Sequence, residues 1–291
     1  MHHTPCFLSL PGLGVALVAA ALLAGGCAGW PELPILEPTA SPLLAQTSAR
    51  LDALLPADVL LVGEQHDAPA HHDLEQQIIS SLAARGLLAA VALEMADTGV
   101  STAQLKPSST DAQARKALQW DDAAWPWAAY GPAVMAAVRA GVPVLGANLP
   151  RAQMAASMKD GSLDARLPGP ALKAQQQGIR AGHCNLLPES QITPMTRIQV
   201  AKDMAMAEAV HQLLLPGKTV VLLAGSGHVD RRLGVPQHLR PGLNAKALLL
   251  RAGAAADTDR AEAFDSAWAT PALPETDYCA DLKEQLGPSA K

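Results

Sequence analysis

The sequence contains few aromatic residues, which make up 3% of its 291 residues. It also lacks a continuous run of Lys and Arg. The 22 basic residues are interspersed with 27 acidic ones, and the formal net charge is −5. A protein that binds a phosphate backbone needs a concentrated basic surface. We therefore expect no nucleic-acid partner.

Cysteine is also scarce, with four residues and no pair at Cys-x-x-Cys spacing. This absence argues against a structural zinc site. Cys6 and Cys27 lie near the N-terminus, whereas Cys184 and Cys279 lie far along the chain. In an oxidising compartment the last two either form a disulfide or stay as free thiols. We favour a disulfide between them, because exported proteins rarely keep thiols free.

The N-terminus has the pattern of an export signal. Residues 8–26 are almost wholly apolar, and small residues precede Cys27, as in a secretory signal. Cys27 after Ala-Gly-Gly resembles the bacterial lipobox, in which the thiol is acylated, although no Lys or Arg precedes the apolar run and Leu23 lies four residues before the cysteine rather than three. A membrane-spanning helix is the alternative, but the run is short and interrupted by Pro and Gly. We expect a signal peptide over 1–26 and a lipid anchor at Cys27 in the bacterial cell envelope, at the outer membrane facing the periplasm.

After a Pro-rich tether over 27–44, residues 45–285 predict one domain of class α/β. Apolar runs read as strands and alternate with segments of helical periodicity, which favours a largely parallel central sheet flanked by helices. The predicted strands are Asp58–Val62, Ala89–Glu94, Val142–Ala147, Thr219–Ala224 and Lys246–Arg251. The predicted helices are His71–Arg85, Ala133–Ala140 and Thr193–Leu215, the last starting at Thr193-Pro194. The segment from about 150 to 215 predicts a helical insert or lid over the carboxyl ends of the strands.

Two similar motifs follow two of these strands, about 160 residues apart in the sequence: Gly63-Glu64-Gln65-His66 and Gly225-Ser226-Gly227-His228. A glycine at the end of a strand allows a sharp turn. Ligand sites of open α/β sheets form outside the carboxyl ends of the strands. We expect Glu64, His66 and His228 to share one site.

Other polar residues end the second and third strands. Glu94 ends an apolar strand, and a buried charge is costly unless it is paired. We expect it to contact Arg151, a histidine or a metal, in a structural ion pair or in the site itself. Arg151 follows the third strand and can bind a carboxylate, including a haem propionate.

The aromatic residues that are present gather in Trp125-Pro126-Trp127-Ala128-Ala129-Tyr130. Flat aromatic surface suits a planar ligand such as a porphyrin, and a phenolate oxygen can ligate ferric haem iron. The alternative is a cluster that only packs in the core. His183, in Gly182-His183-Cys184, is a second candidate ligand, or part of a loop fixed by the disulfide.

The chain resembles the ChaN family of haem-binding lipoproteins, grouped with the TraB, Tiki and erythromycin-esterase-like proteins. The resemblance covers roughly Leu51 to Cys279 and rests on several motifs in order. They are Gly63–Asp67 with His71, Leu93–Met95, Trp127–Tyr130, Asn148–Arg151, Gly182–Cys184 with Pro188-Glu189, Gln199–Ala207, Gly225–His228 and Tyr278-Cys279. It implies a mixed α/β fold, membrane anchoring, haem binding and a role in iron acquisition. It leaves open a homodimer and an outer-membrane haem transporter as partners.

Two functions fit these residues, and we favour a binding protein over an enzyme. In the first, haem binds at the sheet edge with Tyr130 as iron ligand, while Arg151, His66 or His228 holds the propionates. In the second, a divalent transition metal held by Glu64, His66, Glu94 and His228 activates water for hydrolysis, with Glu64, His66 and His228 as the catalytic groups. A lipoprotein whose motifs only close the sheet is the third alternative.

Overall fold

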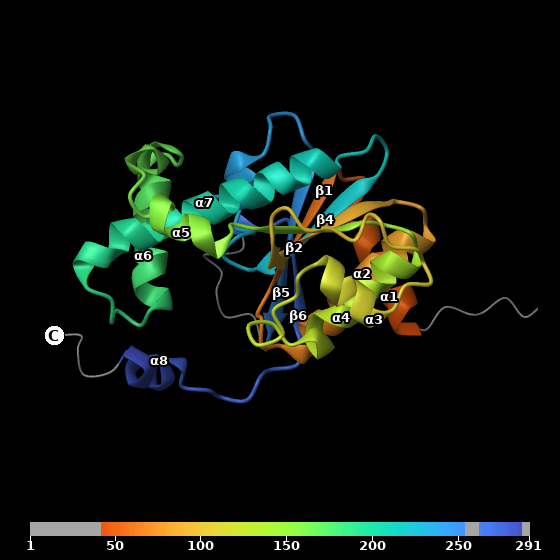
Figure 1. The fold of residues 1–291 in the computed structure, drawn as a ribbon, viewed down its shortest axis with the longest axis horizontal. Coiled ribbons are helices and arrows are strands. Elements are labelled where there is room, and N and C mark those ends of the chain that lie inside the picture. Colours follow the sequence, from red (N-terminus) through yellow and green to blue (C-terminus); the bar gives the residue numbers. More distant parts are fainter. Residues whose placement is uncertain (1–41, 254–261, 287–291) are drawn as a thin grey trace, which may run out of the picture. The chain divides into compact units, whose positions relative to one another are not determined.

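The computed structural model describes residues 42–253 and 262–286 (Figure 1). A six-stranded sheet in the order β3-β2-β4-β1-β5-β6 forms its centre, and all neighbouring strands pair in parallel. The strands are β1 Val59–Glu64, β2 Leu88–Asp97, β3 Val144–Asn148, β4 Thr219–Gly225, β5 Ala245–Ala252 and β6 Ser266–Thr270. The predicted α/β class and the five predicted strands are confirmed.

Helices cover both faces of this sheet. The α-helices are α1 Pro42–Asp52, α2 Pro69–Ala84, α3 Asp111–Ala117, α4 Trp127–Arg139, α5 Arg151–Ser157, α6 Gly169–Gly182, α7 Glu189–Leu213 and α8 Tyr278–Leu286, and the 3-10 helices are η1 Gly161–Ala165 and η2 Val235–His238. Among the described residues, no helix is long and apolar enough to cross a membrane. The expected signal peptide and Cys27 lie outside the described residues, and α1 starts three residues before the expected domain boundary at 45.

The strands are apolar on both faces, because each face packs under helices. On one face, Leu60 and Val62 of β1 join a core with α1, α2, α3 and α4. On the other, Val59 and Leu61 join a core with α7. Figure 1 shows the same division, with α1 to α4 on one side of the sheet and α7 across the other.

The predicted helical insert comprises α5, η1, α6 and the first half of α7. It has a small core of its own, formed by Leu149, Leu163, Leu167, Val200 and Ala201. Helix α7 begins at Glu189, and Pro194 lies inside it, so the predicted start at Thr193 is wrong. Pro194 is the sixth residue of the helix, beyond the first turn in which proline is readily tolerated, so the carbonyl of Ser190 lacks its helical hydrogen-bond donor.

Candidate functional site

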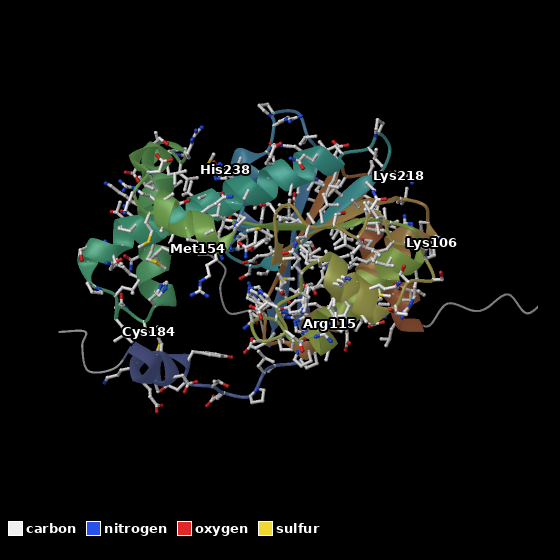
Figure 2. The ribbon with its side chains drawn as sticks, viewed as in Figure 1. Lys106, Arg115, Met154, Cys184, Lys218 and His238 are labelled. Carbon is white, nitrogen blue, oxygen red and sulfur yellow. A yellow bond between two sulfur atoms is a disulfide. The ribbon has the colours of Figure 1, made fainter. Side chains whose placement is uncertain are left out.

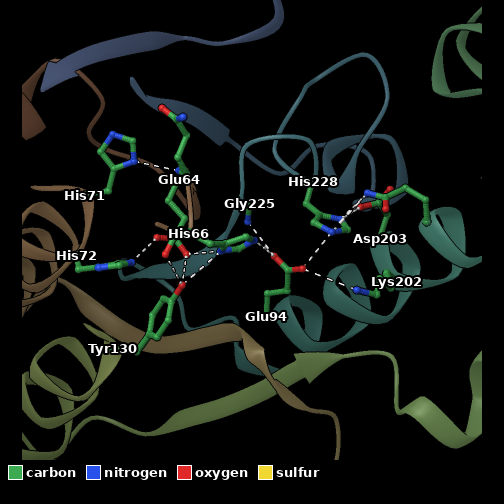
Figure 3. A network of polar contacts seen from close by, with 12 residues as sticks. Glu64, His66, His71, His72, Glu94, Tyr130, Lys202, Asp203, Gly225 and His228 are labelled. Carbon is green, nitrogen blue, oxygen red and sulfur yellow. Dashed lines mark hydrogen bonds and ion pairs between the residues drawn. The ribbon is translucent and has the colours of Figure 1, made fainter. Parts of the chain in front are cut away.

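The two glycine–histidine motifs meet at one edge of the sheet, because β1 and β4 are neighbours and end together. Glu64 at the end of β1 is level with Gly225 at the end of β4. The next strand, β2, pairs with β4 on its other side and contributes Glu94. The expected convergence of Glu64, His66, Glu94 and His228 is observed, and Figure 3 shows the polar network that they form.

Glu64 is the centre of one half of this network. Its carboxylate lies 2.8 Å from Nδ1 of His66 and 3.2 Å from Nε2 of His72. The hydroxyl of Tyr130 donates a hydrogen bond to Glu64 Oε1 at 3.1 Å. Burial would raise the pKa of Glu64, but hydrogen bonds and charge interactions with the two histidines lower it to about 2. Glu64 is therefore an anion at neutral pH.

Glu94 connects the two halves. Its Oε2 lies 3.8 Å from Nε2 of His66 and accepts a hydrogen bond from the backbone N–H of Gly225 at 2.8 Å. Its Oε1 lies 3.2 Å from Nε2 of His228 and 3.9 Å from Nζ of Lys202. Burial alone would raise the pKa of Glu94, but the nearby histidines and the Gly225 N–H hold it below its ordinary value. Of the residues expected as partners of Glu94, the histidines His66 and His228 lie next to it.

His228 ends the chain of contacts at α7. Its Nδ1 lies 2.5 Å from Oδ1 of Asp203, and Gln199 approaches the same ring at 3.1 Å. Burial would lower the pKa of His228, but Glu94 and Asp203 raise it to about 10. Burial raises the pKa of Asp203 to about 6. The imidazole is thus positively charged between two buried carboxyl groups.

Sequence reasoning gave no role to the α7 residues of this network: Gln199, Lys202 and Asp203. Gln199 and Asp203 are four residues apart, which places them on one face of a helix. The available signals were the Gln199–Ala207 motif of the family resemblance and an Asp between Val200 and Ala207 on an otherwise apolar helix face. What the sequence did not indicate is that this face meets the second glycine–histidine turn.

A further carboxyl group, Glu75 of α2, is fully buried near Glu64. Burial and the charge of Glu64 raise its pKa well above the ordinary value. Glu75 is therefore held as a neutral acid next to the Glu64 anion, because two adjacent buried carboxylates cannot both be charged without a large cost.

Three other residues were predicted for the site: Tyr130, Arg151 and His183. None of them lies next to the exposed face of His66 in the way a haem ligand there would need. Tyr130 is 1% exposed, with its ring against His72 and Trp125, and burial raises the pKa of its hydroxyl. To ligate iron it would have to break its bond with Glu64 and leave the core, so this placement disagrees with the ligand role expected for it. Arg151 is exposed at the start of α5.

His183 ends α6, where its Nδ1 contacts the carbonyl of Ile179 at 2.8 Å. It lines a cavity of about 490 Å³ together with Gln199 and the Ser226-Gly227 turn. His183 is therefore near the second motif, on the same cavity as Gln199 of the network.

The site histidines and carboxylates face one another as acid–imidazole pairs. Within residues 42–253 and 262–286, no group of three or more His, Cys, Asp or Glu side chains is arranged to hold a metal ion. His228 has carboxylate oxygens opposite both ring nitrogens. The arrangement expected for a divalent metal at Glu64, His66, Glu94 and His228 does not fit this geometry.

The edge of the site has one aromatic residue that the sequence analysis assigned no role. Tyr278 is 54% exposed, and its hydroxyl donates a hydrogen bond to Asp67, the neighbour of His66. The side chain of His66 is itself 36% exposed and its ring packs against Trp125, with centroids 4.8 Å apart. An exposed phenol and an indole, from two other parts of the chain, thus contact the adjacent residues Asp67 and His66.

The comparisons with known proteins agree with this architecture. The sequence profile of a family described as "Haem-binding uptake, Tiki superfamily, ChaN" matches residues 50–239. No curated protein matches the chain. The solved structure "Cofacial heme binding to ChaN of Campylobacter jejuni" is 25% identical, has a TM-score of 0.59, and the match covers 72% of this chain and 87% of that one.

Two effector structures have lower identity. The type III effector HopBA1 is 17% identical with a TM-score of 0.46, over 79% of this chain and 92% of its own. RRSP, a MARTX toxin effector domain from Vibrio vulnificus, is 16% identical with a TM-score of 0.37, over 73% of this chain and 36% of its own. The profile match covers more than half of the sequence, and the chain therefore belongs to the ChaN family of haem-binding uptake proteins in the Tiki superfamily.

Proposed function

We propose that this protein binds ferric haem at the sheet edge next to His66 and serves haem and iron acquisition. Family membership and the Campylobacter jejuni relative, which binds haem cofacially, support the ligand. The observation that carries the proposal is the exposed phenol of Tyr278, held by Asp67 at the edge of the network. A phenolate oxygen is a known haem-iron ligand.

The residues at this edge fit a haem. The chain has only two tyrosines, and Tyr278 is the exposed one. We therefore assign the iron ligand to Tyr278 rather than to Tyr130. Trp125 offers a partly exposed indole next to His66, and such flat surface suits a porphyrin.

Cationic groups for the propionates are also present. Arg151 is exposed, and the side chain of Lys202 is 20% exposed. Of the two histidines predicted to bind a propionate, His66 is the better candidate, because His228 is buried and both of its ring nitrogens face carboxylates. A bound haem would supply the iron that the Tyr278 phenolate ligates, and in its absence the Tyr278 hydroxyl donates a hydrogen bond to the Asp67 carboxylate.

Replacing each tyrosine with phenylalanine tests the proposal. Tyr278→Phe removes one exposed oxygen and its hydrogen bond to Asp67, while the Cys184–Cys279 disulfide still holds α8. We therefore expect a folded protein that binds hemin about tenfold or more weakly and lacks the phenolate-to-iron absorption band. Tyr130→Phe is the matched control, since it removes the same oxygen from the core. It should keep the band.

Absorption titrations with hemin measure both results. A Tyr278→Phe protein with the spectrum and affinity of the unmodified chain would refute the assignment of Tyr278. If only Tyr130→Phe loses the band, the ligand is the buried phenol, as the sequence analysis expected. No hemin uptake by the unmodified protein would refute the function itself.

The proposal includes the membrane attachment expected from the sequence. Acylation of Cys27 would hold the haem-binding domain at the outer membrane, facing the periplasm, on a Pro-rich tether. An outer-membrane haem transporter and a second copy of the chain are the partners that this placement would bring within reach.

A further inference from the structure

The C-terminal helix α8 is held to the molecule by very little packing. From Tyr278 to Glu284, every described side chain is exposed except Leu282, which is half-buried. The segment that leads to it from β6 is likewise exposed, apart from Leu273. Figure 1 shows α8 near the insert helix α6, at the end of that extended segment. A helix of nine residues without a buried face is marginal by itself.

Among the described side chains, a disulfide and a hydrogen bond on adjacent residues join this helix to the rest of the molecule. Cys279 forms a disulfide with Cys184 at the end of α6, and Tyr278 donates its hydroxyl to Asp67. The first contact joins α8 to the insert, and the second joins it to the first glycine–histidine motif. The phenol is therefore one residue away from a covalent attachment point.

The attachment point on the insert is itself a hydrogen-bonded helix end. Asn185 N–H donates to the carbonyl of Arg180 at 2.8 Å, and Cys184 N–H donates to that of Ala181 at 2.9 Å. Cys184 has a φ of 56°, so these bonds form the left-handed cap that ends many helices. Arg180 also pairs with Glu189 at the start of α7. The labelled Cys184 in Figure 2 thus belongs to a fixed helix end rather than to a free loop.

We propose that the Cys184–Cys279 disulfide is a redox-sensitive clasp that positions Tyr278 next to Asp67, so that haem binding depends on the oxidised pair. The inference rests on the proposed function, because it gives Cys184 and Cys279 the role of positioning residues for the haem ligand. Without the bond, Tyr278 is tethered only through the exposed segment after β6. Its effective concentration at the site then falls to that of a group on a flexible linker.

Opening the clasp requires a dithiol as reductant. One of its thiolates attacks a cysteine sulfur and breaks the sulfur–sulfur bond, and its second thiol resolves the mixed disulfide. Two electrons pass to the protein, each cysteine gains one proton, and the dithiol becomes a cyclic disulfide. Reoxidation needs a disulfide oxidant such as oxidised glutathione, which takes two electrons and two protons from the cysteine pair and is released as two thiols.

The experiment compares hemin binding by the full chain before and after cleavage of the disulfide. The protein is reduced with dithiothreitol, alkylated with iodoacetamide and freed of reagents, so that neither thiols nor reductant meet the iron. We expect the dissociation constant for hemin to rise about tenfold and the phenolate band to weaken. Reoxidation of a reduced but unalkylated sample should restore both.

Two variants separate positioning from other effects. The double variant Cys184→Ser and Cys279→Ser should bind like the cleaved protein and should not respond to the same treatment, which controls for Cys6 and Cys27. Tyr278→Phe should bind weakly in both redox states, with no further change on reduction. A reduction effect of full size in Tyr278→Phe would overturn the proposal, because the clasp would then act through something other than the phenol.

A readout without haem distinguishes the clasp from the proposed function. Amide hydrogen exchange in residues 271–286 should accelerate on reduction, while exchange in the strands stays slow. Unchanged exchange, or equal hemin affinity and spectra in the two redox states, overturns the clasp and leaves haem binding intact. Failure of the oxidised protein to bind hemin overturns the proposed function, and this inference with it.

Discussion

Two glycines of the second motif have very different surroundings, although they are separated by one residue. A Cβ atom on Gly225 would lie 2.8 Å from Nε2 of His66 and 3.6 Å from Oε2 of Glu94. A Cβ atom on Gly227 would meet no atom within 4 Å. Gly225 is therefore needed for the close approach of His66, whereas Gly227 is not needed for space.

The contrast between the two glycines predicts different effects when a single methyl group is added at each position. Gly225→Ala should displace the His66 ring from Glu94, and the pKa of His66, which Glu64 and Glu94 raise against the effect of burial, should fall. NMR titration of the histidines measures that shift. The cost in stability should be about 1 kcal/mol, because a side chain rather than backbone gives way.

Gly227→Ala is the matched control. It should leave the His66 titration unchanged and alter the free energy of unfolding by no more than about 1 kcal/mol, in the stabilising direction. Equal His66 titration curves for the two variants would contradict the contact between Gly225 and His66.

Residue-level prediction from the sequence succeeded where the backbone itself determines position. Glu64, Glu94 and His228 follow or end buried parallel strands, and such strand ends share one edge of a sheet. The burial of Tyr130 and the exposure of Tyr278 could not be predicted from the sequence. Whether each phenol is buried depends on the rotation of α4 and on the path of the segment after β6, and neither has a local sequence signal.

At the scale of elements, His228 connects three parts of the fold. It lies on the turn after β4, and its ring nitrogens face Glu94 of β2 and Asp203 of α7. The charged imidazole thus attaches the long insert helix to the sheet edge. Removal of its proton would leave Glu94 without its main positive neighbour in the interior.

The stability of this attachment should depend on pH. The pKa of His228 is raised to about 10 in the fold, compared with an ordinary value near 6.5 in the unfolded chain. A raised pKa means that its contribution is fully present below about pH 6.5 and is lost as pH rises towards 10. We expect unfolding free energy to fall by on the order of 3 kcal/mol across this window.

Denaturant unfolding between pH 7 and 10 measures the effect, above the range in which Asp203 titrates. His228→Asn should unfold more easily at pH 7 and show a much flatter pH profile. Parallel profiles for the two proteins would mean that His228 is uncharged at neutral pH.

Element-level prediction from sequence was right where the hydrophobic pattern is long. The five predicted strands are runs of buried apolar residues. β6 was missed because Ser266–Thr270 is short and only partly buried, so its pattern resembles that of a loop. The start of α7 was predicted too late because proline is common in the first turn of a helix, and Pro194 was taken to mark that turn. In the structure, Pro188 is the residue that directly precedes the helix.

At the scale of the whole molecule, every residue of the proposed haem site lies between Glu64 and Tyr278 in the sequence. The expected anchor, Cys27, lies outside the described residues. The site residues take their positions from the sheet, α7 and the disulfide. Haem binding and membrane attachment should therefore be separable.

Replacing Cys27 tests this separation in the intact chain. Cys27→Ala removes the thiol that acylation requires, so the protein should move from the membrane to the soluble fraction of the cell envelope. Its hemin affinity should stay within about a factor of two of the unmodified protein, because no site residue changes. Cell fractionation and mass spectrometry of the N-terminus measure attachment, and absorption titration measures binding. An unmodified protein that carries no acyl group at Cys27 would refute the lipid anchor, whereas a Cys27→Ala variant with weakened hemin binding would show that the anchor or the membrane contributes to the site.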